Sequence, residues 1–170
     1  MNRMLIAVGM LTALGAAADV VTNSWIGADG GKWSVAANWS ANHVPDGNEY
    51  VIFPDTGSSY SVEVDGDYEI GCFYVDYRTA GASGTVDLTL TGSGKITATG
   101  NNTSQHCVRT NRRLVMDGPT LKMSGDVALL IYNGIVVKAG SHLYPTKLLL
   151  HWGGSYMNIE GGEVEVSAYT

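Results

Sequence analysis

The sequence predicts an all-β fold, a β-solenoid of the right-handed parallel β-helix type. Between Leu88 and Val166 a motif of apolar-x-apolar, then glycine, then a returning apolar residue occurs four times. Its glycines, Gly92, Gly118, Gly140 and Gly161, lie about 21 to 26 residues apart, a spacing typical of stacked repeats. A second landmark precedes three of the copies, at Asn111, Asn133-Gly134 and Gly153-Gly154. After residue 18, no window keeps the apolar periodicity of a helix for three turns.

An antiparallel β-sandwich is the alternative that the same punctuation allows. The segment Tyr132-Asn133-Gly134-Ile135 carries the Asn-Gly pair that favours a two-residue hairpin. The two landmarks that stay in phase favour the solenoid over the sandwich.

The first 18 residues read as a signal peptide. A basic residue, Arg3, precedes the apolar run Leu5–Leu14 and the small residues Ala16-Ala17-Ala18. That run is too short to cross a bilayer, and no later segment predicts a transmembrane span. We therefore expect a secreted or cell-surface protein, exported in a bacterial context to the outer surface.

The net charge limits the possible partners, and the cysteines and residue spacings limit the possible disulfides and metal sites. The formal net charge is −6, which argues against nucleic acid and anionic membranes as partners. In an oxidising compartment, Cys72 and Cys107 either form a disulfide or remain buried thiols. The pattern offers no metal site and no cofactor site, because the spacings typical of zinc and EF-hand calcium sites are missing.

Residues 19–57 are expected to form an N-terminal cap. Trp25, Trp33 and Trp39 fall within 15 residues of one another and are large enough to cover the apolar end of a first rung. Asn38 is expected to satisfy backbone groups of a turn. The alternative is a glycan-binding platform of exposed indoles at Trp33, Trp39 or Trp152.

This segment resembles the opening of bacterial autotransporter-like and related surface proteins with β-helical passengers. The resemblance rests on Trp25-Ile26-Gly27, Gly31-Lys32-Trp33, Asn38-Trp39, Pro45, Gly47 and Val51-Ile52-Phe53. It implies an extracellular β-helix with an adhesive or structural role and no catalytic residues. The chain departs from that family in being short and in carrying no β-barrel translocator.

Residues 58–170 are predicted to form the rungs of the solenoid. Strands are expected at Tyr60–Val64 and, as one continuous run enclosed on both faces, at Tyr68–Tyr77. Gly118 and Gly161 are expected at tight turns with positive φ. Seven residues are predicted to point inward in one stack: Leu114, Met116, Leu121, Leu143, Met157, Ile159 and Val164.

Catalytic residues are not predicted anywhere in the chain. Arg109, Arg112 and Arg113 form a basic cluster, interpreted as a solvated patch. A β-helical polysaccharide lyase or hydrolase would need grouped carboxylates near that cluster, and Asp117 is its only near neighbour in sequence.

The expected function is that of a structural or adhesive cell-surface module without catalysis. A glycan-binding module is the alternative, and a lyase or hydrolase fragment is a weaker one. The partners expected are an extracellular glycan or a host or cell-surface matrix. The strand at Glu163–Ser167 is followed by three residues, so we also expect a chain truncated at its C-terminus, with further rungs or self-association covering the open end.

Overall fold

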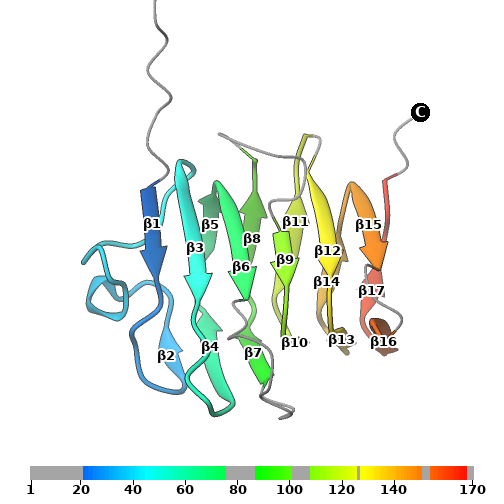
Figure 1. Ribbon diagram of the computed structural model, residues 1–170, viewed down its shortest axis with the longest axis horizontal. Helices are drawn as coiled ribbons and strands as arrows, with labels where there is room; N and C mark the ends of the chain where they lie inside the picture. The colour runs from blue at the N-terminus through cyan, green and yellow to red at the C-terminus, as the bar shows by residue number, and fades with distance from the viewer. Residues whose placement is uncertain (1–20, 76–86, 101–107, 126, 151–153, 168–170) are drawn as a thin grey trace, which may run out of the picture.

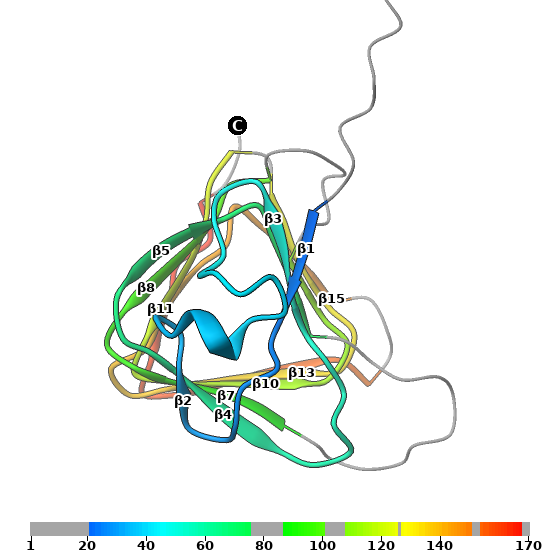
Figure 2. The same cartoon turned by 90° about the vertical axis from the view of Figure 1, so that its left-hand side faces the viewer.

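The computed structural model describes residues 21–75, 87–100, 108–125, 127–150 and 154–167. These residues form three parallel sheets that wind around one core, as Figures 1 and 2 show. Sheet 1 contains β1 (Val21–Ser24), β3 (Glu49–Phe53), β6 (Cys72–Val75), β9 (Val108–Thr110), β12 (Ala128–Ile131) and β15 (Lys147–Leu150). Sheet 2 contains β2 (Gly31–Lys32), β4 (Tyr60–Val64), β7 (Asp87–Gly92), β10 (Arg113–Asp117), β13 (Gly134–Lys138) and β16 (Tyr156–Glu160). Sheet 3 contains β5 (Asp67–Ile70), β8 (Lys95–Ala98), β11 (Thr120–Met123), β14 (His142–Tyr144) and β17 (Glu163–Val164).

From β3 onward the chain visits the three sheets in turn, so each of these rungs contains one strand from each sheet, whereas the first turn contributes only β1 and β2. Successive rungs pair in parallel, for example Leu114 with Leu88 below and Ile135 above. Seen from the N-terminal end, the chain passes clockwise from sheet 1 to sheet 2 to sheet 3 as it recedes (Figure 2). This is a right-handed parallel β-helix, so the predicted solenoid is confirmed and the sandwich alternative is wrong.

The Asn-Gly signal that favoured a hairpin marks a corner of the solenoid instead. Strand β12 ends at Ile131 in sheet 1, and β13 begins at Gly134 in sheet 2. Strands β12 and β13 do not pair with each other, and each pairs in parallel with the equivalent strands of the neighbouring rungs. A turn that suits a hairpin therefore also suits a bend between two sheets.

The predicted single strand Tyr68–Tyr77 is also a correction, because it is two strands that meet at a corner. Ile70 ends β5 in sheet 3, and Cys72 begins β6 in sheet 1. Between them, the backbone at Gly71 lies so close to Glu49 that an added Cβ would contact the Glu49 carbonyl oxygen at 2.9 Å. A corner needs this close approach, and glycine permits it.

The core is a set of apolar columns that run along the solenoid. Leu114, Met116, Leu121 and Leu143 are fully buried, as their repeat positions predicted. Met157 and Val164 are half-buried, and Ile159 is 51% exposed, although its register partner Val137 is 0% exposed. Six of the seven residues therefore lie in the core or pack against it, as predicted, and Ile159 is the exception because no described strand covers the last rung.

The glycines of the repeat form turns between sheets 2 and 3. Gly92, Gly118, Gly140 and Gly161 all have positive φ, which is +116° at Gly118 and +82° at Gly161. The prediction of positive φ at Gly118 and Gly161 is confirmed. Non-glycine residues seldom adopt this backbone conformation, so the motif keeps glycine at that step.

The N-terminal end of the solenoid is covered by the segment that contains the 3₁₀ helix Ala36–Asn38 (Figure 2). Trp25, Trp33 and Trp39 are at most 2% exposed, and Trp39 packs at centroid distances of 5.1 Å from Trp25 and 4.8 Å from Trp33. The Trp39 indole N–H donates to the Trp33 carbonyl at 2.8 Å. Asn38 Nδ2 donates to the Lys32 carbonyl at 2.9 Å, the role expected of its side chain.

A buried polar network joins β1 and β3 to this cap. The Glu49 carboxylate is 3% exposed as a residue and accepts from Asn23 Nδ2 at 3.2 Å. His43 Nε2 lies 2.9 Å from Glu49 Oε1, and its Nδ1 lies 3.1 Å from the Ala41 carbonyl. Both partners are acceptors, so the doubly protonated imidazolium fits, and the hydrogen bond to Glu49 raises the pKa of His43.

Several expectations fall on residues outside the described ones. These are the signal peptide at residues 1–18, Cys107 of the possible disulfide, and Trp152 of the possible glycan platform. The other cysteine, Cys72, is buried on β6. Among the described residues there is no helix with the length and hydrophobicity needed to span a bilayer.

Candidate functional site

The outward side chains of sheet 3 form two columns that run the length of the solenoid. In one column the register places Asp67, Lys95, Thr120, His142 and Glu163 in line. In the other it places Glu69, Thr97, Lys122 and Tyr144 in line, and Glu165 continues it because its N–H donates to the Leu143 carbonyl at 3.0 Å. Neighbouring positions are about 4.8 Å apart, the strand spacing of a sheet.

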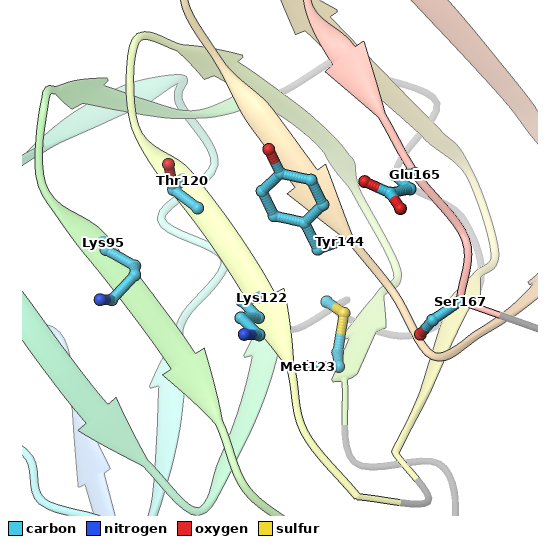
Figure 3. A pocket seen from close by; sticks show the side chains of 7 residues that line it. All are labelled: Lys95, Thr120, Lys122, Met123, Tyr144, Glu165 and Ser167. Atoms are coloured by element: carbon cyan, nitrogen blue, oxygen red, sulfur yellow. The ribbon is translucent and has the colours of Figure 1, made fainter.

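An open hollow of about 550 Å³ lies over the later part of these columns (Figure 3). Its lining residues come from β8, β11, β14 and the residues after β17; they are Lys95, Thr120, Lys122, Met123, Tyr144, Glu165 and Ser167. The Tyr144 ring lies between Lys122 and Glu165 in the view of Figure 3. A cation, an aromatic ring and an anion therefore follow one another over three rungs.

The charges in the two columns differ in whether they are paired. In the first column, Lys95 Nζ lies 3.1 Å from Asp67 Oδ2, and His142 Nδ1 lies 2.7 Å from Glu163 Oε2. In the second, Lys122 and Glu165 form no ion pair within the part of the chain that the structure describes. Their charged groups are therefore available to a ligand.

Tyr144 is held in place by its neighbours on the same face. Its ring stacks against the His142 imidazole, with a centroid distance of 6.0 Å and an interplanar angle of 10°. Its hydroxyl lies 3.4 Å from Glu163 Oε2. Desolvation and the Glu163 carboxylate both raise the pKa of Tyr144, so the hydroxyl stays protonated and can donate a hydrogen bond.

Sheet 2 presents a contrasting outer face on which opposite charges pair with each other. Arg113 makes a two-pronged contact with Asp87 of the rung below, with Nε donating to Oδ1 at 2.7 Å. Lys138 Nζ lies 3.0 Å from Asp117 Oδ2. The exposed pair of Lys138 with Asp117 adds little to stability, but both pairs leave fewer free charges for a ligand.

The arginines interpreted as a solvated patch do not form one, which corrects that expectation. Arg112 is 4% exposed, and its Nη2 lies 3.0 Å from Asp55 Oδ1. Arg113 pairs with Asp87 on sheet 2, and the Arg109 guanidinium lies over the Tyr74 ring of sheet 1 at 5.6 Å. The three side chains lie in different environments and do not converge on one site.

Other sequence-based candidates also change in the light of the structure. The indoles of Trp33 and Trp39 are buried, so they cannot stack on a glycan. Among the described residues, His, Cys, Asp and Glu do not gather in a group of three or more that could hold a metal ion.

Sequence reasoning missed the residues of the hollow, although their signal is present in the repeat. In each copy, the residue directly after the apolar residue that follows the glycine points outward from sheet 3. Those residues are Thr97, Lys122, Tyr144 and Glu165. An alignment of the four copies at that position would have found the column.

Comparison of the chain with protein-family models, curated proteins and solved structures finds no match.

Proposed function

We propose that this protein is an exported structural or adhesive module of a bacterial surface, without catalytic activity, that binds an extended glycan or matrix polymer along sheet 3. The observation that carries the proposal is the column Lys122, Tyr144 and Glu165 along the hollow on sheet 3, in which Lys122 and Glu165 form no ion pair with any described residue. The apolar columns and the capped end support a stiff rod, as a structural module requires.

The ligand class follows from the chemistry of that column. An aromatic ring offers a flat apolar surface to the C–H face of a sugar, while an ammonium and a carboxylate bind hydroxyl groups on either side. A hexose unit is about as long as the ~4.8 Å strand spacing, so successive sugars can follow successive rungs. The N-terminal segment resembles that of extracellular surface β-helices. This resemblance supports the same structural or adhesive role.

Binding to a panel of immobilised bacterial and host glycans tests this proposal. The purified chain is expected to retain a subset of extended glycans, and Tyr144→Ala and Lys122→Ala are each expected to weaken that binding about tenfold or more. Lys138→Ala is the control, because it removes an outward lysine from sheet 2 and leaves sheet 3 unchanged. Equal loss with Lys138→Ala, or no loss with the two sheet 3 variants, would contradict the assignment of the site.

The absence of catalysis is tested on the same glycans. Incubation of the chain with uronate polymers, with and without calcium, is expected to release no unsaturated or reducing ends. Turnover that persists in independently purified preparations would overturn the non-catalytic part of the proposal while leaving the binding face intact.

A further inference from the structure

The last rung, made of β15, β16 and β17, has an end that differs from every rung below it. Its inward side chains occupy the same columns as buried residues of the preceding rung, but Leu150 is 54% and Ile159 is 51% exposed. Their register partners, Ile131 and Val137, are each 0% exposed. This end therefore presents apolar side chains that are arranged like a core.

The backbone of the same rung presents a hydrogen-bonding edge. The N–H groups of Tyr156, Glu163 and Glu165 donate to the preceding rung at 3.0 Å each. Because alternate residues of a strand direct their polar groups to opposite sides, those of Met157, Ile159 and Val164 face away from the solenoid. Within the described residues, no strand pairs with this edge.

The opposite end of the solenoid restricts what can dock here. Trp25, Trp33 and Trp39 cover that end. In head-to-tail stacking, the open rung of one copy would meet this covered end of the next copy. The covered end does not offer a strand from each of the three sheets for pairing. Two copies that meet through their open ends leave both capped ends outside. Such an arrangement is closed and cannot grow into a fibre.

We propose that the last rung is a dimerisation surface, and that two copies of this chain meet there about a twofold axis through Asn158. The axis would pair β16 with β16 of the second copy in antiparallel fashion. Met157 would then lie opposite Ile159 of the second copy. The backbone groups of these two residues, which face away from the solenoid, would form hydrogen bonds with each other, and their apolar side chains would come into contact. Sheets 1 and 3 flank sheet 2 on either side in Figure 2, so the same rotation brings β15 against β17 of the second copy.

The charges on the outer surface agree with this axis. Lys147 is an outward position of β15, and the outward positions after it in the rung include Glu163 and Glu165 on and beyond β17. Antiparallel pairing sets outward positions against each other, so this axis brings Lys147 to the same side of the interface as Glu163 and Glu165 of the second copy. An axis through β15 would instead bring Glu160 close to Glu163 and Glu165 of the second copy, which is repulsive.

Sedimentation velocity of the full chain, from low to high micromolar concentration, tests the dimer. A reversible monomer–dimer equilibrium is expected, and Ile159→Lys is expected to raise the dimer dissociation constant about tenfold or more. Ile26→Lys is the matched control, because Ile26 is a similarly exposed isoleucine (63%) at the capped end. The control is expected to dimerise like the parent chain.

A charge exchange provides the second variant series, so that the test does not depend on one substitution. Lys147→Glu is expected to weaken the dimer, and adding Glu165→Lys to it is expected to restore part of the loss. A monomer at every concentration would overturn the proposal. So would a ladder of larger species weakened equally by Ile26→Lys and Ile159→Lys, because that result indicates head-to-tail growth.

Discussion

Alanine substitution of two corner glycines separates the cost of backbone conformation from the cost of close contact between rungs. Gly118 and Gly140 are the motif glycines of two successive repeats, one residue apart in register, with φ of +116° and +80°. A Cβ at Gly118 would overlap the carbonyl oxygen of Gly92 in the rung below, whereas a Cβ at Gly140 would meet nothing within 4 Å. Gly118→Ala therefore carries two penalties, and Gly140→Ala carries one.

The magnitudes follow from these two terms. Positive φ costs an alanine about 1–2 kcal/mol, which is the whole expected effect of Gly140→Ala. The overlap at Gly118 adds about 1–3 kcal/mol, because the backbone must shift and its N–H donates to Ser141 Oγ at 2.7 Å. The loss of chain entropy in the unfolded state is similar for both substitutions, so it cancels in their difference.

Thermal and denaturant unfolding, followed by circular dichroism, measures the difference. At about 2–4 °C per kcal/mol for a chain of this size, Gly118→Ala is expected to melt about 2–12 °C below Gly140→Ala. Denaturant midpoints with an unchanged slope would show that the native state itself is destabilised. Equal stability of the two variants would refute the close packing of corners, and a neutral Gly140→Ala would refute the backbone term.

Two further predictions concern the core and the cap. Leu143→Ala removes a fully buried side chain and is expected to cost about 2–5 kcal/mol in denaturant unfolding, whereas Ile159→Ala in the monomer is expected to cost clearly less; equal costs would contradict the open last rung. The Glu49 carboxylate raises the pKa of His43, so the folded state holds the proton more tightly than the unfolded state. The stabilisation is then complete below the unfolded pKa of 6.5 and is lost as the pH rises through the higher folded value. Melting temperatures between about pH 5 and 9 are expected to show this loss in the parent chain and not in His43→Gln; a matching pH dependence in both would contradict it.

The repeat predicted the fold because each rung of a solenoid is built from consecutive residues, so the pattern of its core residues is visible in the local sequence. Residues such as Leu114 and Met116 alternate within a strand, and each glycine marks a corner, so the signal needs no knowledge of distant contacts. The corner at Gly71 was missed for a related reason. Strands β5 and β6 are separated by one residue, so their alternation reads as a single strand when the close approach of Glu49 is unknown.

The environment of the arginines could not be predicted in the same way. Arg113 meets Asp87 because they are register partners in adjacent rungs, at a separation of 26 residues. Arg112 meets Asp55 at a corner, two rungs away from its own. Neither Asp87 nor Asp55 is close to its arginine in sequence, so the local sequence alone suggests three unpaired cations.

The distribution of charge pairs decides which face of the rod can act as a binding surface. Below the last rung, the inward positions of the strands are committed to the core, so the outward positions can vary with less effect on the fold. On sheet 2, Asp87 with Arg113 and Asp117 with Lys138 use register partners to satisfy each other. On sheet 3, Lys122 is separated from both carboxylates of its column by a whole rung, from Glu69 by the Thr97 rung and from Glu165 by the Tyr144 rung. A ligand that spans three rungs can contact both Lys122 and Glu165, and a side chain of the column cannot pair with both while Tyr144 lies between them.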